Sequence, residues 1–241
     1  MEIELHQGDC LEVIKTLEDK CIDLTITSPP YNLGNNHHTQ NNRHFPYHDD
    51  IPEEQYQTQQ KDLLQEIYRI TKDTGSLIYN HKNRIKKGTQ ITPYEWLLDT
   101  DWVIKQEWVW QNGSPNFDKI RLYPHTERIY WLAKDTKTKL QNTISHIDVF
   151  TSSEWKAVGV KGQKHARAFP EQLVDDVLSV FPEAEVIFDP YLGSGTTGVV
   201  CKRKGRQRFI GIELEPKYYD LAKERIEAPF QESLLEGGSR G

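Results

Sequence analysis

The chain has 241 residues, of which 27% are charged and 36% hydrophobic, values typical of a globular protein with room for one large α/β domain. No apolar run approaches the roughly 20 residues that cross a bilayer, and the alternation of charged and apolar residues in positions 1–7 argues against a signal peptide. Three scattered cysteines favour neither a disulfide framework nor a zinc site, so we expect an intracellular protein. The net charge of −6 means that any DNA binding needs a local basic surface.

The first predicted elements lead to a Pro-Pro turn. A strand is expected over residues 2–6, a helix over 11–18 and a buried strand over 22–26, followed by Thr27-Ser28-Pro29-Pro30-Tyr31-Asn32. Two prolines cannot continue a sheet ladder, so the chain must leave the sheet there. Ser28 and Tyr31 are therefore predicted at the carboxyl end of a strand, where doubly wound folds bind their ligands.

The next segments are a polar loop, a helix, a strand and a basic loop. Residues 33–52 contain four histidines but no acid or cysteine at ligand spacing, so we expect a loop that closes over a substrate and no metal site. A helix is predicted over 53–71, ended by Thr74-Gly75, and a strand over 76–80. Residues 82–88 are then either a solvated turn or a phosphate-contacting loop, and composition does not separate the two.

The rest of the chain is predicted to contain helices, two aromatic-rich strands and one irregular segment. Residues 94–98 are predicted as a short helix, and 102–110 and 127–133 as strands whose aromatic residues belong to the core. Residues 135–168 look irregular and partly basic. A helix follows Phe169-Pro170, the basic run 202–208 is interpreted as solvated surface, a last helix begins at Pro216, and the tail after residue 230 is expected to be disordered.

The most informative stretch is a strand over 186–188 followed by a glycine turn and the start of a helix at Thr196. This order is typical of nucleotide-binding α/β folds, and the missing lysine excludes a phosphate-binding P-loop. The strand over 208–213 ends on Glu213, about 20 residues later, where such folds hold ribose hydroxyls with a carboxylate. The alternative is an ordinary glycine turn in a βαβ unit.

Together these segments resemble the β-class amino methyltransferases of DNA, which use S-adenosylmethionine to modify cytosine N4 or adenine N6. The resemblance rests on residues 27–32, on 189–197 and on 209–213, and extends to Gly8-Asp9 and to 165–171. The catalytic turn precedes the cofactor motif, which is the order of that class. The resemblance implies a doubly wound, mostly parallel, Rossmann-like sheet with a small irregular target-recognition insert.

The resemblance also implies roles. Ser28, Pro29, Pro30 and Tyr31 would hold the target base. The S-adenosylmethionine site would be formed by Asp9 near the adenine, Phe169 and Pro170 packed beside it, Glu213 at the ribose, and a loop at the methionine end that comprises Asp189, Tyr191, Gly193, Ser194, Gly195 and Thr196. Tyr191 stands where many relatives have Phe.

The implied domain plan divides the chain into a catalytic half, residues 1–134, a recognition insert, 135–168, a cofactor-binding half, 169–230, and a tail, 231–241. The insert is short, so loops around 33–50 and 82–88 are candidates for DNA recognition. Six basic residues are predicted DNA contacts: Arg43, Lys82, Arg84, Lys86, Lys87 and Lys164. Double-stranded DNA is the expected partner, with a homodimer and a cognate restriction endonuclease as further possibilities.

The expected chemistry is direct methyl transfer to an exocyclic nitrogen, with Ser28 Oγ and the Pro29 carbonyl accepting the amino hydrogens and Tyr31 stacking on a flipped base. Ser28 preceded by Thr27 looks like the cytosine-N4 form of the family motif, and adenine N6 is the alternative. A methyltransferase of RNA or of a protein glutamine would place its cofactor motif first, and a non-catalytic DNA-binding subunit would not need both motifs intact.

Overall fold

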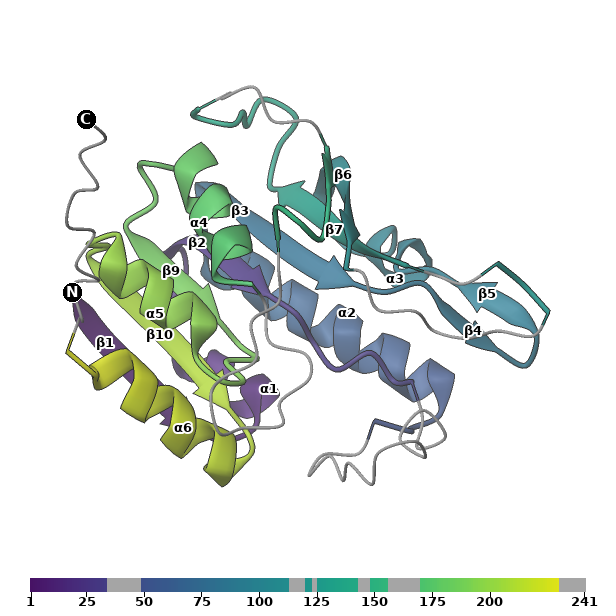
Figure 1. Cartoon of the computed structure of the whole chain (residues 1–241), viewed down its shortest axis with the longest axis horizontal. Coiled ribbons are helices and arrows are strands. Elements are labelled where there is room, and N and C mark those ends of the chain that lie inside the picture. Colours follow the sequence, from purple (N-terminus) through teal and green to yellow (C-terminus); the bar gives the residue numbers. More distant parts are fainter. Residues whose placement is uncertain (34–48, 113–119, 123–124, 143–147, 156–169, 230–241) are drawn as a thin grey trace, which may run out of the picture.

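The computed structural model describes residues 1–33, 49–112, 120–122, 125–142, 148–155 and 170–229. In this part of the chain an eight-stranded sheet has the order β1-β10-β9-β2-β3-β7-β6-β8, and a separate hairpin, β4-β5, projects beyond it (Figure 1). The strands are β1 (Glu2–Gln7), β2 (Ile22–Thr27), β3 (Thr71–His81), β4 (Arg84–Lys86), β5 (Thr89–Ile91), β6 (Val103–Gln111), β7 (Thr126–Ala133), β8 (Val149–Phe150), β9 (Val186–Asp189) and β10 (Arg208–Glu213).

Strands β1, β10, β9, β2 and β3 are mutually parallel, and β7 is antiparallel to both β3 and β6. Strand β9 has β10 on one side and β2 on the other, so the chain order reverses there. A crevice at such a reversal is where doubly wound sheets bind ligands. The predicted mostly parallel, doubly wound sheet is confirmed.

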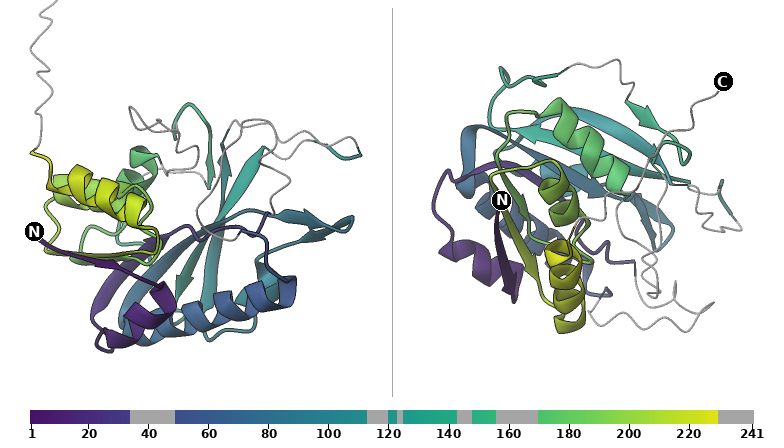
Figure 2. Two further views of the ribbon diagram at one scale, coloured as in Figure 1. Left: turned by 90° about the horizontal axis from the view of Figure 1, so that it is seen from below. Right: turned by 60° about the vertical axis from the view of Figure 1, so that its left-hand side comes forward.

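Helices cover both faces of the sheet (Figure 2). The helical elements are α1 (Cys10–Val13), the 3-10 turn η1 (Ile14–Thr16), α2 (Glu53–Ile70), α3 (Tyr94–Leu97), α4 (Glu171–Val180), α5 (Thr196–Arg203) and α6 (Pro216–Glu227). Side chains of α4, α5 and α6 pack on one face with Ile187 and Phe209, whereas those of α1, α2 and α3 pack on the other with Phe188 and Ile210. The alternation along β9 and β10 follows from the two-residue repeat of a strand. None of the described helices combines the length and apolar character of a membrane span.

Three predicted segments differ from the structure. The strand predicted over 76–80 begins earlier: α2 ends at Ile70, one residue before its predicted end, and residues 71–75 already belong to β3. A Cβ on Gly75 would lie 2.8 Å from the Asp23 carbonyl oxygen, so this glycine permits close approach of β3 to β2. The basic loop, residues 82–88, contains β4 and the turn of the β4-β5 hairpin, and β5 follows it. In the segment 135–168, β8 pairs with β6, and Trp155 stacks on Phe150 in the core.

The interpretation of the basic run 202–208 as solvated surface was wrong in part. The Arg206 guanidinium is buried and donates to three carbonyls. Leu178 lies in the last turn of α4, and Pro182 and Ala184 lie just after this helix. Lys202 Nζ donates to the last carbonyls of α6. Carbonyls at helix ends lack partners within the helix, and these two cations supply them.

Candidate active site

Four polar side chains meet where β2 and β3 end and β7 begins. Because β7 runs against β3, the first residues of β7 lie at the same sheet edge as the last residues of β3, and Asn80 pairs with Ile129. The Ser28 hydroxyl lies 2.8 Å from the Tyr31 hydroxyl and 3.1 Å from Asn80 Oδ1. The Tyr31 hydroxyl lies 2.7 Å from Asn80 Oδ1 and 2.9 Å from Glu127 Oε2. We call these four side chains the oxygen cluster.

The Pro-Pro turn is held in place by neighbouring aromatic residues. The Tyr56 hydroxyl of α2 donates to the Pro30 carbonyl at 2.7 Å, and His81 Nε2 lies 2.7 Å from the same hydroxyl. The ring centroids of Tyr31 and His81 are 4.8 Å apart. Burial lowers the pKa of His81 to about 3, so the ring is neutral at pH 7. A neutral, packed histidine supports the turn and is not a candidate acid.

Tyr31 is only 8% exposed, and its hydroxyl is bonded within the oxygen cluster. Asn32, with φ of 53°, accepts from the Ile51 amide and donates to the Ile51 carbonyl. The two residues that flank the segment 33–50 are therefore bonded to each other beside the turn. Asparagine tolerates this left-handed backbone better than most residues. The sequence predicted Ser28 and Tyr31 at a strand end, and the structure brings both there with Pro29 and Pro30.

The glycine turn after β9 lies against the end of β10. Glu213 Oε2 accepts from the Gly193 amide at 2.8 Å, and Oε1 accepts from the Glu215 amide at 2.9 Å. Burial raises the pKa of the Glu213 carboxyl. Each carboxylate oxygen has a second lone pair that a hydroxyl could donate to. Among the described residues, a Cβ on Gly193, which has φ of 54°, would have one neighbour within 4 Å, the Tyr191 carbonyl oxygen at 3.8 Å.

Gly195 has a different reason to be glycine. Its φ is 81°, and an added Cβ would lie 2.9 Å from Ala222 Cβ on α6. The residue therefore permits the close packing of the loop on α6. Ser194 and Thr196 are buried beside it, and Arg225 of α6 donates to the Ser194 carbonyl and, at 3.0 Å, to Ser194 Oγ.

Asp189 points into the protein. Its carboxylate accepts from Thr197 Oγ1 at 2.7 Å, from Thr27 Oγ1 at 3.1 Å and from the Tyr191 amide at 3.1 Å. Burial raises its pKa to about 6, although these hydrogen bonds favour the charged form. One carboxylate thus joins the end of β2 to the first turn of α5, which fixes the Pro-Pro turn relative to the glycine turn.

The remaining predicted cofactor residues lie around this loop. Tyr191 packs in the core next to Cys10. Asp9 is exposed and caps α1 by accepting from the Leu11 amide at 2.8 Å. Pro170 is buried at the start of α4, and Phe169 lies outside the described residues.

The predicted DNA contacts are in different environments. Arg84 is 2% exposed, donates to both carboxylate oxygens of Glu53 and lies over the rings of Tyr56 and Trp96. These contacts favour a structural role, because they tie the hairpin to α2 and α3. Lys82 is 9% exposed, Lys86 Nζ lies 3.2 Å from Glu53, and Lys87 is exposed at the hairpin turn. Arg43 and Lys164 lie outside the described residues.

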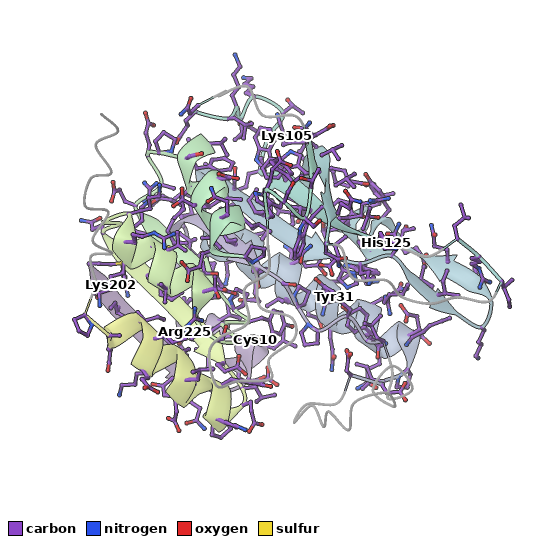
Figure 3. All side chains as sticks on the ribbon, in the orientation of Figure 1. Cys10, Tyr31, Lys105, His125, Lys202 and Arg225 are labelled. Carbon is purple, nitrogen blue, oxygen red and sulfur yellow. The ribbon has the colours of Figure 1, made fainter. Side chains whose placement is uncertain are left out.

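Figure 3 shows the two halves of the site through labelled side chains: Arg225 and Cys10 lie beside α5, α6 and α1, and Tyr31 lies toward the β3-β7 side. Sequence reasoning missed Asn80, Glu127 and Arg225. Asn80 is the last residue of the strand predicted after the Pro-Pro turn, so its position at a strand end could have been detected in the sequence. Glu127 and Arg225 reach the site from an antiparallel strand and from the face of a helix, and no local pattern marks them.

The sequence profile of the N6/N4 DNA methylase family matches residues 22–224, which include the catalytic turn, the glycine turn and both strands after them. The chain belongs to this DNA methylase family. The match includes all four residues of the oxygen cluster and the whole glycine turn. The family resemblance found in the sequence is therefore confirmed.

Three similar proteins extend the comparison. The type II methyltransferase M.HinfI of Haemophilus influenzae is 31% identical over 91% of this chain and 67% of its own length. The structure of the cytosine-N4-specific PvuII DNA methyltransferase matches with a TM-score of 0.76 and 19% identity, over 95% of this chain and 87% of that chain. A putative DNA modification methylase from Thermus thermophilus, complexed with S-adenosylmethionine, matches with a TM-score of 0.66 and 19% identity, over 94% of this chain and 95% of that chain.

Proposed function

We propose that this DNA methylase transfers the methyl group of S-adenosylmethionine to the exocyclic amino nitrogen of a base rotated out of duplex DNA, with cytosine N4 as the preferred target. The observation that carries the proposal is the junction between β9 and β2. The Asp189 carboxylate bonds Thr27, the residue before Ser28, and Thr197, in the first turn after the glycine loop. A ligand on the loop and a base at Ser28 would therefore be neighbours.

The cofactor fits the residues at the end of β9 and β10. Glu213 retains acceptor lone pairs for two ribose hydroxyls, while the Gly193 and Glu215 amides fix its orientation. Among the described residues, only the Tyr191 carbonyl oxygen would come within 4 Å of a Cβ on Gly193, so a ligand could approach this backbone, and the amides of the first turn of α5 favour the negative end of the methionine moiety. The Gly8 amide donates to the Glu213 carbonyl, which brings the next residue, Asp9, close to the end of β10. Asp9 would face the adenine.

The amino nitrogen of a base is a weak nucleophile because its lone pair is delocalised into the ring. Hydrogen-bond acceptors at the amino hydrogens localise that lone pair, and Ser28 Oγ and the Pro29 carbonyl are suited to this role. The Pro30 carbonyl is already bonded to Tyr56, so it is engaged in holding the turn. When bound, the cofactor supplies the methyl group and leaves as a neutral thioether. Fixed alignment of the two reactants would supply several kcal/mol of the rate enhancement, of the order of 7–11 in favourable intramolecular cases.

Cytosine N4 is preferred because Ser28 is preceded by Thr27, as in the cytosine-N4 form of the family motif. The Ser28 hydroxyl is a neutral acceptor. The likeness to the PvuII enzyme, which is cytosine-N4-specific, favours the same choice. Adenine N6 is the alternative. A non-catalytic DNA-binding subunit is the alternative of another class, and the intact oxygen cluster favours an enzyme. A homodimer and a cognate restriction endonuclease, the usual setting of a type II methyltransferase, are proposed partners.

The test is nucleoside mass spectrometry on DNA from cells that express the wild-type chain, the Ser28→Ala variant or no methyltransferase. We expect N4-methylcytosine only with the wild type. N6-methyladenine would retain the enzyme and reverse the choice of base. If neither nucleoside appears and calorimetry detects no binding of S-adenosylmethionine, the non-catalytic alternative holds.

A further inference from the structure

Glu127 is a carboxylate that contacts the predicted catalytic turn from the opposite strand. Its Oε2 lies 2.9 Å from the Tyr31 hydroxyl, and its Oε1 accepts from Asn112 Nδ2 at 2.8 Å. The next residue, Arg128, pairs with Glu107 on β6 at 2.9 Å. Among the described residues, no ion pair involves Glu127, so its charge is balanced by neutral donors alone.

The oxygen cluster has fewer hydroxyl protons than it has short oxygen–oxygen contacts. Asn80 Nδ2 donates to the Arg128 carbonyl at 3.1 Å, which turns Oδ1 toward the hydroxyls of Ser28 and Tyr31. Four oxygen–oxygen contacts of 2.7–3.1 Å join the cluster. Each needs one proton, and the two hydroxyls supply only two when Glu127 is ionised. A proton arriving on Glu127 would add a third, and the amino group of a base at Ser28 would bring further donors. The cluster is therefore built to receive protons.

We propose that Glu127 is the terminal acceptor of the proton that the methylated amino group must lose, and that Ser28 and Tyr31 carry this proton to it. This inference rests on the proposed function. As the nitrogen–carbon bond forms and the carbon–sulfur bond breaks, the nitrogen gains a positive charge and one of its N–H bonds becomes acidic. That proton passes to Ser28 Oγ, the Ser28 proton passes to the Tyr31 oxygen, and the Tyr31 proton passes to Glu127 Oε2.

The step balances in atoms and charge. A cationic cofactor, a neutral base and an ionised Glu127 give a neutral thioether, a neutral methylated base and a neutral Glu127. Glu127 is half-buried, so it can return the proton to solvent before the next turnover. Asn80 and Asn112 have no proton to lose under these conditions, and they hold Tyr31 and Glu127 in line. Glu127 acts through Tyr31 and is in this sense a positioning residue for proton release.

The test compares single-turnover methylation by Glu127→Gln, Tyr31→Phe and the double variant, with enzyme in excess and a labelled methyl group on S-adenosylmethionine. The DNA is unmethylated genomic DNA from the same cells without the methyltransferase. Glu107→Gln removes a half-buried carboxylate from the neighbouring strand without touching the oxygen cluster, and it is the matched control. Cofactor binding by calorimetry, within about twofold of the wild type, verifies that each variant is folded.

We expect the wild-type rate to rise with pH across the acidic range and then level off. Glu127→Gln should remove this rise and lower the plateau by about 100-fold, the usual scale of general-base catalysis. Tyr31→Phe keeps the ring but breaks the path in its middle, so it should have the same effect, and the double variant should lose no more than either single variant. Glu107→Gln should match the wild type at every pH.

Two results would overturn the inference. Glu127→Gln could retain the wild-type rate, or it could lower the rate by one factor at all pH values, which would mean that Glu127 only supports Tyr31. If Glu127→Gln does not fold, Tyr31→Phe decides in the same way. No methylation by the wild type itself would contradict the proposed function, whereas an active wild type with an unchanged pH profile in both variants contradicts this inference alone.

Discussion

At the scale of single residues, two carboxylates in the cofactor half have opposite orientations. The Glu213 carboxylate lies against the glycine turn and is fixed by two backbone amides. Asp189, which the resemblance includes among the residues at the methionine end of the cofactor, faces inward and bonds two threonines. The Glu213 carboxylate, proposed to bind the cofactor, thus accepts from backbone amides, whereas the Asp189 carboxylate connects two elements through threonine hydroxyls.

Glu213→Gln should weaken the binding of S-adenosylmethionine by about 10- to 100-fold. A charged acceptor contributes about 1.5–3 kcal/mol to a hydrogen bond, and the amide of glutamine offers one acceptor oxygen in place of two. Isothermal titration calorimetry measures the change. Glu215→Gln is the control, because only the backbone amide of Glu215 contributes to this contact. Equal dissociation constants for wild type and Glu213→Gln would remove Glu213 from the cofactor site.

At the scale of elements, cations that looked like solvated surface complete the helix ends. Arg206 is 8% exposed and donates to the Leu178 carbonyl in the last turn of α4 and to the carbonyls of Pro182 and Ala184 just after it. Arg203, three residues earlier, pairs with Glu171 and Asp175 at the surface. Both lie in one basic run, and only their neighbours in space distinguish them.

Arg206→Met should lower the free energy of unfolding by about 3 kcal/mol, because it leaves buried carbonyls without donors. Arg203→Met removes only exposed ion pairs, and it should cost less than about 1 kcal/mol. Urea denaturation followed by circular dichroism compares the two. Similar losses in both variants would mean that the Arg206 contacts are unimportant for stability.

The β4-β5 hairpin is a second element whose residues have separate roles. Arg84 is bonded to Glu53 at its base, and Lys87 is exposed at its turn. Lys86→Ala combined with Lys87→Ala should therefore reduce the salt dependence of DNA binding, by up to about two phosphate contacts. Binding measured by fluorescence anisotropy at several salt concentrations gives the slope. An unchanged slope would make the hairpin a solvated surface, and Lys217→Ala on α6 is a basic control away from the hairpin.

At the scale of the whole molecule, the catalytic and cofactor halves share one sheet. Strand β2 from the first half pairs with β9 from the second, and Asp189 bonds Thr27 across this junction. The proposed division into residues 1–134 and 169–230 therefore describes the order of motifs along the chain, while the sheet and both hydrophobic clusters join the halves.

Asp189 should make stability depend on pH. Its pKa in the folded protein, about 6, is above the model-peptide value of 3.8, so folding favours the protonated form. Stability from this group is complete below about pH 4 and is lost as pH rises through 6, by roughly 3 kcal/mol. Asp189→Asn cannot ionise, so the difference in unfolding free energy between the two proteins should change with pH in this window. A constant difference from pH 4 to 7 would contradict the buried, raised carboxyl.

The sequence by itself determined the fold class, the family and the positions of both motifs. Periodicity separates strands from helices, two prolines must end a strand, and a glycine turn between strand and helix marks a ligand site, so each signal lies within about ten residues of chain. Only the tertiary structure decided which side chains complete the site. Glu127 reaches Tyr31 because β7 runs against β3, Arg225 reaches Ser194 from α6, and Arg84 turns inward to Glu53. These contacts join residues 31 to 96 positions apart, and they depend on strand order and helix packing, which no local pattern encodes.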